Sequence, residues 1–390
     1  MSTAIRTAAS LLAALVLLAP LCTAAVAAEE PAKPAAPTLT EVLAASSVSV
    51  SGYLDVSYQH LSGTGVFADG SPDRVFDARQ DSFSVHQAAV TIAYQPKQGF
   101  GALVNLIAGQ DADVFAPYDI NPGAHSKFDY PQAYLQYASG PLTIIAGRYV
   151  TLAGAETIDP RTDMNFSRSI IYGFAIPFAH TGIRATVVAS EQFTFVVGVV
   201  NGWDDLKDTN KAKTAELGAT FAPAKAFSLS LAGYFGKERV GGLTEVGPEG
   251  QRKLVDVIGT WNATDALSVV LNYDWGRQDG GAANAGVARW NGLAGYLNYS
   301  FNDHWRASLR SEYLDDQDGY RTGLVQKWRE TTLTVAWMPS KAVELRLEGR
   351  ADRSDHSVFV KDSAYFASAG DPQFLGDRQS SVALETLYKF

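Results

Sequence analysis

The chain of 390 residues contains a single cysteine, three methionines and six histidines. The cysteine, Cys22, lies in the N-terminal segment, so the remainder of the chain cannot form a disulfide or a cysteine-ligated metal site. The histidines are scattered, and no two of them are spaced as a His-x-x-x-His pair. These absences predict a protein that has neither a metal site nor another cofactor.

Long hydrophobic runs and clusters of basic residues are also missing. Beyond residue 28, no stretch approaches the roughly 18 consecutive apolar residues of a membrane helix. The 32 Lys and Arg residues are outnumbered by 41 Asp and Glu, and without a basic run we expect no nucleic-acid partner. There is no Gly-x-Ser-x-Gly motif, and Ser84 with His86 is the nearest nucleophile and base pair, so we predict that the protein is not an enzyme.

Glycine and aromatic residues, by contrast, are plentiful, with 34 Gly, 19 Phe, 17 Tyr and 7 Trp, a composition that favours strands and turns. Residues 1–28 have the pattern of a signal peptide, with Arg6 before an apolar run and small residues before Glu29. Residues 29–46 are expected to form a periplasmic linker and a short helix that starts with the Thr38 and Glu41 capping box. Residues 47–390 are expected to form one β-domain.

Strict alternation of side-chain character recurs in segments of about ten residues along this domain. In residues 343–352 every charged side chain falls on one face, and the other face carries only small or apolar side chains. Residues 305–313, 266–275, 227–235 and 382–390 alternate in the same way. A helix would mix the two faces, so these segments are predicted to be strands.

The connections between the segments alternate in length. Seven are tight: 95–99, 139–141, 190–192, 222–225, 262–265, 302–303 and 339–341. Eight are longer and polar: 61–80, 111–128, 151–175, 204–212, 238–250, 278–288, 316–327 and 354–378. Fifteen connections imply sixteen strands, and short turns on one rim with long loops on the other are typical of an all-β, antiparallel, up-and-down barrel of the bacterial outer membrane. Fourteen or eighteen strands, or a soluble β-sandwich, are the alternatives.

A barrel in a bilayer must close, because an unpaired backbone group in hydrocarbon costs several kcal/mol. Its apolar face then contacts lipid, and its polar face lines the lumen. Aromatic residues next to the tight turns are expected to form an interfacial belt: Tyr94, Phe100, Tyr137, Phe193, Phe221, Phe227, Trp261, Phe301, Trp305, Trp337 and Phe390. Strand parity predicts these lumen-facing residues: Asp55, Arg184, Glu216, Asp256, Asp274, Arg306, Arg310, Glu312, Arg346, Glu348, Arg350, Asp352 and Glu385.

Two arrangements of the lumen charges are open. Arg306, Arg310, Arg346 and Arg350 would form a basic ladder that favours anions, or acidic neighbours at 312, 344 and 348 would neutralise them in a network of salt bridges. The loop 151–175 is expected to fold inward and narrow the pore, with the equally long loop 354–378 as its rival. The residues assigned to this constriction are Glu156, Asp159, Arg161, Asp163 and Arg168.

Several stretches together resemble the OmpL-like β-barrel porins of Gram-negative outer membranes. They are Ser51-Gly52-Tyr53-Leu54-Asp55, Gly147-Arg148, Ala155-Glu156-Thr157-Ile158-Asp159, Asn165-Phe166-Ser167-Arg168-Ser169, Pro177, His180-Thr181-Gly182-Ile183-Arg184 and Val200-Asn201-Gly202-Trp203-Asp204. The terminal Tyr388-Lys389-Phe390 is similar to the aromatic end that such barrels present to their assembly machinery. The resemblance implies a pore-forming envelope protein.

The expected function is passive diffusion of small hydrophilic solutes through a water-filled channel, because about sixteen strands leave an aqueous lumen. The alternative is a non-conducting barrel that acts as an adhesin or structural anchor through its long loops. The expected partners are outer-membrane lipid, small solutes and the barrel assembly machinery, and formation of a homo-oligomer is left open. The sign of charge selectivity is left open as well.

Overall fold

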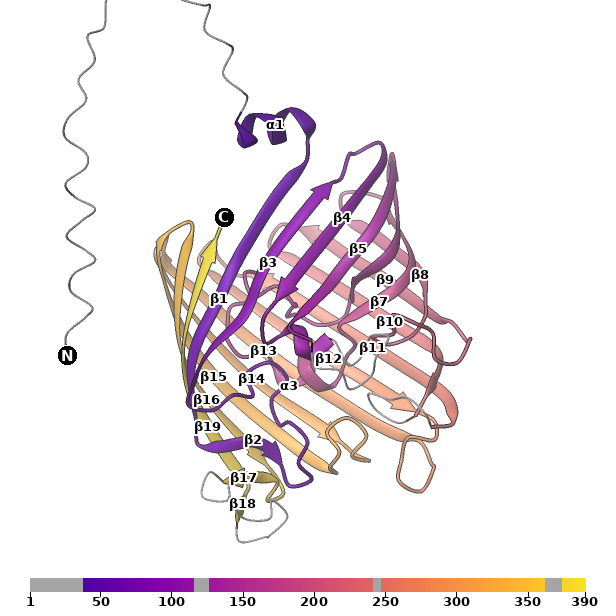
Figure 1. Cartoon of the computed structure of the whole chain (residues 1–390). Coiled ribbons are helices and arrows are strands. Elements are labelled where there is room, and N and C mark those ends of the chain that lie inside the picture. The colour runs from indigo at the N-terminus through magenta and orange to yellow at the C-terminus, as the bar shows by residue number, and fades with distance from the viewer. Residues whose placement is uncertain (1–37, 116–125, 241–246, 362–373) are drawn as a thin grey trace, which may run out of the picture. The chain divides into compact units, whose positions relative to one another are not determined.

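The computed structural model describes residues 38–115, 126–240, 247–361 and 374–390. The chain divides into two units, residues 1–42 and 43–390. The second unit is a closed barrel of sixteen antiparallel strands, drawn in Figure 1. Within the described residues, no helix is both long and apolar enough to cross a membrane.

Each barrel strand pairs with its neighbours in chain order, and β1 pairs with both β3 and β19, which closes the sheet. The predicted number of strands is therefore confirmed. The strands are β1 (Ser49–Leu61), β3 (Ser82–Tyr94), β4 (Gly99–Ala108), β5 (Phe128–Ser139), β6 (Leu142–Val150), β7 (Ala179–Val188), β8 (Phe193–Val200), β9 (Thr214–Ala224), β10 (Phe227–Arg239), β11 (Glu249–Asn262), β12 (Leu267–Gln278), β13 (Ala288–Asn302), β14 (Trp305–Asp316), β15 (Gln326–Ser340), β16 (Val343–Ser354) and β19 (Arg378–Lys389).

The seam between the first and last strands depends on a glycine. The backbone N–H of Gly52 donates to the carbonyl of Phe390 at 2.9 Å, and the N–H of Phe390 donates to the carbonyl of Gly52 at 3.0 Å. A Cβ at Gly52 would lie 2.2 Å from the Phe390 ring, so only glycine lets that ring lie against the backbone. The Phe390 ring is itself exposed on the outside of the barrel.

The outer surface is apolar and has an aromatic rim. Among the predicted belt residues, ten have exposed side chains and Phe221 is half-buried. Neighbouring rings stack on each other, with centroids 4.8 Å apart for Phe193 and Phe221 and 6.1 Å apart for Trp305 and Trp337. This arrangement is what an interfacial belt at the short-turn rim requires.

Three short helices accompany the barrel: α1 (Leu39–Ser46), α2 (Ala112–Phe115) and α3 (Ile170–Phe174). Helix α1 starts with reciprocal capping, because the N–H of Thr38 donates to the Glu41 carboxylate at 2.7 Å and the N–H of Glu41 donates to the Thr38 hydroxyl at 3.3 Å. The predicted signal peptide, residues 1–28, lies outside the described residues.

Two of the predicted loops, 61–80 and 354–378, contribute a second sheet. The strands β2 (Gly63–Phe67), β17 (Phe359–Lys361) and β18 (Leu375–Gly376) pair in the order β18-β17-β2. Phe67 packs on Phe359 and on Trp328 of β15, with ring centroids 5.8 and 5.3 Å apart. Treating these segments as loops alone was wrong, because strands of two to five residues are too short to show the alternation that reveals the barrel strands.

Candidate functional site

The connection between β6 and β7, residues 151–178, folds into the barrel and is called the inner loop below. Its helix α3 lies within the ring of strands (Figure 1) and contacts β13 and β14. Ile170, Ile171 and Tyr172 of this helix are buried. The side chain of Ser169 caps the helix by accepting the N–H of Tyr172 at 3.1 Å.

The first part of the inner loop is fixed to β10, β11 and β12. The N–H of Leu152 donates to the Tyr234 hydroxyl at 2.9 Å, and the N–H of Gly154 donates to the Asp256 carboxylate at 3.2 Å. The N–H of Ala155 donates to the side-chain oxygen of Asn272 at 2.9 Å. The loop thus crosses from β6 to strands four to six places further along the wall.

Its second part is fixed to β14 and β16 by carboxylates that accept backbone N–H groups. Glu348 accepts the N–H groups of Phe166 at 2.7 Å and Ser167 at 3.0 Å. Glu312 accepts those of Ile170 at 2.7 Å and Ile171 at 3.1 Å, at the start of α3. The N–H groups of Ile170 and Ile171 lie in the first turn of α3 and have no acceptor within the helix, so the Glu312 carboxylate of the barrel wall accepts them.

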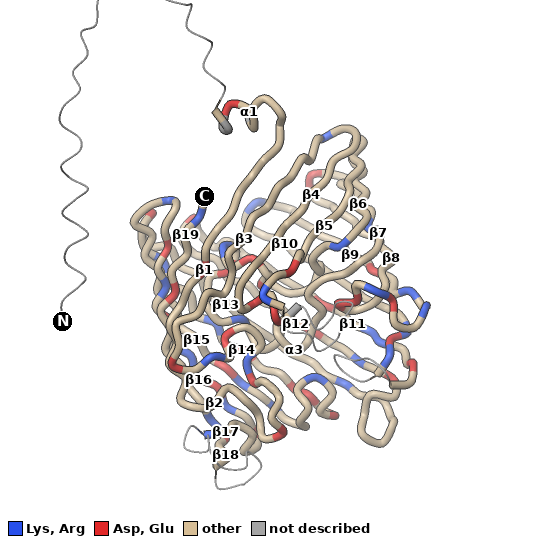
Figure 2. Tube along the Cα trace, viewed as in Figure 1, with Lys and Arg blue, Asp and Glu red and all other residues tan. Residues whose placement is uncertain are grey.

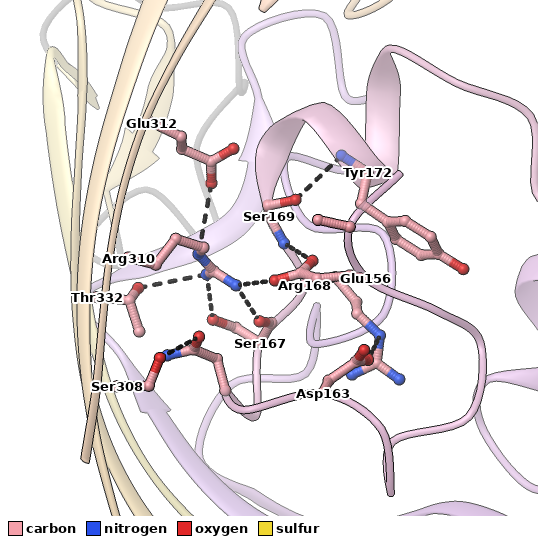
Figure 3. Close-up of polar contacts among 12 residues, drawn as sticks. Glu156, Asp163, Ser167, Arg168, Ser169, Tyr172, Ser308, Arg310, Glu312 and Thr332 are labelled. Atoms are coloured by element: carbon pink, nitrogen blue, oxygen red, sulfur yellow. Dashed lines mark hydrogen bonds and ion pairs between the residues drawn. The ribbon is translucent and has the colours of Figure 1, made fainter. Parts of the chain in front are cut away.

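Arginines of the same wall bind the carbonyl oxygens of the inner loop. Arg346 donates to the carbonyls of Pro160 at 3.0 Å and Asp163 at 2.9 Å. Arg350 donates to the carbonyl of Arg168 at 2.8 Å. Arg310 donates to the carbonyl of Ser167 at 2.6 Å, and Figure 3 shows its contacts with several of these residues.

These arginines are also paired with acidic side chains. Arg310 lies 2.7 Å from Glu156, 3.0 Å from Glu330 and 3.7 Å from Glu312. Arg346 lies 2.7 Å from Glu344 and 3.0 Å from Glu385.

The two remaining arginines follow the same rule: Arg350 lies 2.8 Å from Asp352, and Arg306 pairs with Glu344. Of the two arrangements left open by the sequence, the structure shows the salt-bridge network. Glu348, expected in that network, instead binds the backbone of the inner loop and Thr334.

The five residues assigned to the constriction fall into two groups. Glu156, Asp163 and Arg168 are buried, with Arg168 paired to Asp163 at 3.0 Å and Glu156 accepting the N–H of Ser169 at 2.6 Å. Asp159 and Arg161 pair with each other at 2.6 Å and keep 33% and 24% of their side chains exposed. Three of the five therefore hold the loop in shape, and the other two stay partly exposed, with the Arg161 guanidinium 4.5 Å from the centroid of the Tyr53 ring.

The other predicted lumen residues, apart from the arginine partners above, are also buried on the inner faces of their strands. Arg184 of β7 pairs with Glu216 of β9 at 2.6 Å. Asp256 and Asp274 lie opposite each other on β11 and β12, and Asp55 lies on β1. Interior placement was predictable from strand parity, whereas the Arg184–Glu216 pair joins β7 to β9 across the strand between them.

Further side chains that the sequence analysis did not single out also hold the inner loop and its neighbours. The Trp290 indole N–H donates to the carbonyl of Ala175 at 2.9 Å, and so holds the end of the inner loop. Arg74, in the first long loop, reaches into the barrel and pairs with Asp352 at 2.6 Å. Trp290 and Tyr234 share the inward parity of the charged residues, but nothing in the local sequence around Arg74 indicates its partner.

The end of the inner loop is held by a loop carboxylate. Asp204 accepts the N–H groups of Phe178 at 2.6 Å and Ala179 at 2.9 Å. Burial raises the pKa of Asp204 to about 6, although these two hydrogen bonds act in the opposite direction.

Ser84 and His86, the nearest nucleophile and base pair in the sequence, both lie on the buried face of β3, and His86 contacts other partners. Its Nε2 lies 2.8 Å from the Ser57 hydroxyl, and its Nδ1 lies 3.0 Å from the Asp111 carboxylate. All three residues are buried. This contact chain ties β1 and β3 to the segment before α2, and we assign it a structural role.

The half-buried part of the lumen wall carries hydroxyl groups. Thr186, Thr194, Thr220, Ser230 and Thr260, on β7 to β11, are each partly open on the inner face. Charged residues are sparse on β4 to β8 and frequent on β14 and β16, as Figure 2 shows. A cavity of about 550 Å³ opens at the short-turn rim beside Met164, Asn298 and Ser300. On β7 to β11 the half-buried hydroxyl groups are therefore uncharged, whereas the charged residues Arg184, Glu216 and Asp256 of the same strands are buried.

Solved structures with a similar fold include an outer-membrane channel and a porin. DcaP of Acinetobacter baumannii, an outer membrane channel, is 12% identical, with a TM-score of 0.59 and coverage of 88% of this chain and 97% of its own. The anion-selective porin from Comamonas acidovorans is 13% identical, with a TM-score of 0.57 and coverage of 88% and 99%. OprB of Pseudomonas putida is 10% identical, with a TM-score of 0.58 and coverage of 90% and 96%.

Among curated proteins, none matches this sequence. A family model does match it, over residues 47–390, which is most of the chain. Its description is "Putative beta-barrel porin-2, OmpL-like". The closed sixteen-stranded barrel, the aromatic rim and this match agree on location in the outer membrane. The chain belongs to the OmpL-like β-barrel porin family.

Proposed function

We propose that the barrel conducts small hydrophilic solutes by passive diffusion and that the inner loop narrows its channel. A barrel of this strand number encloses an aqueous lumen unless something fills it. The supporting observation is that the inner loop is held across the lumen by side chains from β10 to β16, including Glu312, Arg346 and Glu348. A loop fixed at so many points reduces the cross-section in a permanent way.

The remaining passage would run along the hydroxyl-lined wall of β7 to β11. Thr220 and Ser230 lie 3.2 Å apart there and present neutral donors and acceptors. Water and hydroxylated solutes exchange hydrogen bonds with such groups at little cost.

The channel is proposed to be only weakly charge-selective. The interior arginines are neutralised by carboxylates, and the half-exposed Asp159 and Arg161 neutralise each other at 2.6 Å. A passing ion would therefore meet little unbalanced charge. Uncharged and dipolar solutes are the substrate class that fits this wall.

Planar-bilayer recording of the purified full-length protein tests the proposal. We expect discrete conductance steps and a reversal potential close to zero in a salt gradient. Replacing Arg346 and its partner Glu385 together with Gln should barely move that reversal potential, because the double variant removes one charge of each sign. Absence of any conductance step from correctly folded protein would refute the channel.

A non-conducting barrel that binds partners through its long loops is the second candidate. The observation that favours it is the sheet of β2, β17 and β18, which is held by a packed core of Phe67, Phe359 and Trp328 at the long-loop end. Folded protein that gives no channel but adheres to a surface or a partner would favour this candidate.

The proposal extends to assembly. One solved relative in fold, OmpT of Vibrio cholerae, is described in a trimer form, and we propose that this barrel also forms a homo-oligomer. Cross-linking in native membranes tests this. Tyr388 and Phe390 are proposed as the signal for the barrel assembly machinery, and Phe390→Ala should lower the amount of inserted barrel.

A further inference from the structure

Three arginines lie side by side on the lipid-facing surface of the barrel, near the long-loop rim. In the strand register, Arg329 of β15 is directly opposite Arg353 of β16, and Arg353 is directly opposite Arg378 of β19. All three side chains are exposed, and their strand neighbours Trp328, Asp352 and Gln379 point into the barrel. The three are called the arginine row below.

Like charges directly opposite each other destabilise a pair of strands. Within the described residues, one carboxylate is paired with the arginine row: Asp377, 3.7 Å from Arg353 and 3.6 Å from Arg378. Arg329 has a ring contact instead, 5.8 Å from the centroid of Tyr313. Two other carboxylates lie nearby but contact Lys327 and not the arginine row. Asp315 is directly opposite Lys327 in the strand register, and Asp355 accepts the backbone N–H of Lys327. One shared, half-exposed carboxylate leaves the arginine row with excess positive charge.

The height of the row in the membrane follows from strand geometry. Arg329 lies eight positions before Trp337, which belongs to the aromatic belt at the short-turn rim. At about 3.3 Å per residue and a tilt of about 40°, Arg329 lies roughly 20 Å above that belt. The apolar band of such barrels is about 25 Å tall, so the row lies at the opposite boundary, among the lipid headgroups.

The residues that lie opposite one another on successive strands agree with this height. Because strands are tilted, a line of opposed residues climbs through the bilayer from strand to strand. This line runs through Leu293 and Tyr313 before it reaches the arginines. A second line runs through Phe235 to Lys253, Arg277 and Arg289. The first line changes from apolar to aromatic to basic and the second from aromatic to basic, as expected where hydrocarbon gives way to charged headgroups.

We propose that the arginine row binds the phosphate groups of a phosphorylated glycolipid of the outer leaflet. Guanidinium groups bind phosphate oxygens in bidentate pairs, and neighbouring strands are about 4.8 Å apart, so three successive arginines can contact one headgroup from several sides. The binding would also relieve the repulsion within the row and fix the orientation of the barrel at its outer boundary.

The test compares the full-length folded protein with the triple variant R329Q/R353Q/R378Q. The probes are lipid A with both phosphates, lipid A stripped of phosphate, and phosphatidylglycerol, each titrated into detergent-solubilised protein. We expect wild type to prefer phosphorylated lipid A, and the triple variant to lose roughly 100-fold in affinity for it, from three basic side chains near a charged lipid surface. Heat-modifiable migration on a gel verifies that each variant is folded.

The matched control is K97Q/K225Q/K341Q, which removes the same charge from exposed positions on the short-turn rim. It should bind phosphorylated lipid A like wild type. Equal affinity of wild type and the arginine variant would overturn the site. Equal binding of phosphatidylglycerol and phosphorylated lipid A would overturn the assignment to a glycolipid. If the arginine variant fails to fold, the single variant R353Q is measured, and an unchanged affinity there also overturns the proposal.

Discussion

The two sides of the lumen wall differ in what their polar residues do. On β14 to β16, charged side chains are buried and bind the inner loop, as Arg310, Arg346 and Glu348 do. On β7 to β11, hydroxyl side chains such as those of Thr220 and Ser230 are partly open. The comparison shows that a charged side chain inside a barrel is not necessarily exposed to a passing solute. Charged side chains that are buried and paired with protein groups stabilise the inner loop instead.

Arg310→Met should produce the largest effect, because it leaves Glu156, Glu312 and Glu330 buried without their shared cation. Breaking a buried pair costs about 3–5 kcal/mol. We expect a lower unfolding midpoint in urea, together with a larger and noisier conductance as the inner loop loosens. Arg79→Met, at an exposed arginine in a long loop, is the control and should match wild type in both measurements. Unchanged conductance in a destabilised Arg310 variant would remove the link between this anchor and the pore.

Glu348→Gln should have a smaller effect on the same side. It removes the charge from two hydrogen bonds to the N–H groups of Phe166 and Ser167, worth about 1–3 kcal/mol. We expect frequent current fluctuations at nearly wild-type mean conductance, measured in single-channel recordings. Glu191→Gln, on an exposed tight turn, should leave the record quiet. Equal noise in the two variants would contradict the anchoring role of Glu348.

Charging the neutral side should change selectivity instead of stability. Thr220→Lys places an unpaired cation on the open wall, so the reversal potential should shift in the direction of anion preference, and Thr220→Asp should shift it the opposite way. The charge-balanced double variant Arg346→Gln with Glu385→Gln, on the charged side, should shift the reversal potential less than either. A larger shift in that double variant would mean that the solute path follows β14 to β16 and not β7 to β11.

The smallest effect is expected for the double variant Asp159→Asn with Arg161→Gln. This pair is partly exposed, and such pairs contribute about 0–1 kcal/mol. Because the variant removes one charge of each sign, the reversal potential should not move. A large shift would mean that one of the two side chains faces a passing ion alone.

The barrel itself could be predicted from the sequence because its signals are local. Alternation within residues 343–352 and the contrast between tight and long connections both follow from the pleat and from the two faces of the membrane. The small sheet of β2, β17 and β18 was missed, since segments such as Leu375–Gly376 are too short to carry a pattern.

The candidate site was predictable only in part. The length and charge of the loop 151–175 indicated an inward fold, but its five charged residues were treated as one group. In the structure Glu156 is buried because it pairs with Arg310, which lies more than 100 positions away in the sequence, whereas Arg161 stays partly exposed. No local spacing encodes such a partner.

The sequence alone determined the class of fold, its strand number, its outward apolar face and its family, because each follows from periodicity or from motifs within a few residues. The tertiary structure decided which charges are neutralised and which part of the wall stays open. The physical reason is that an ion pair depends on where two side chains meet in space. In a closed barrel with a loop folded inside it, Arg346 meets its partners from β19 and from the inner loop only after the ring of strands is complete.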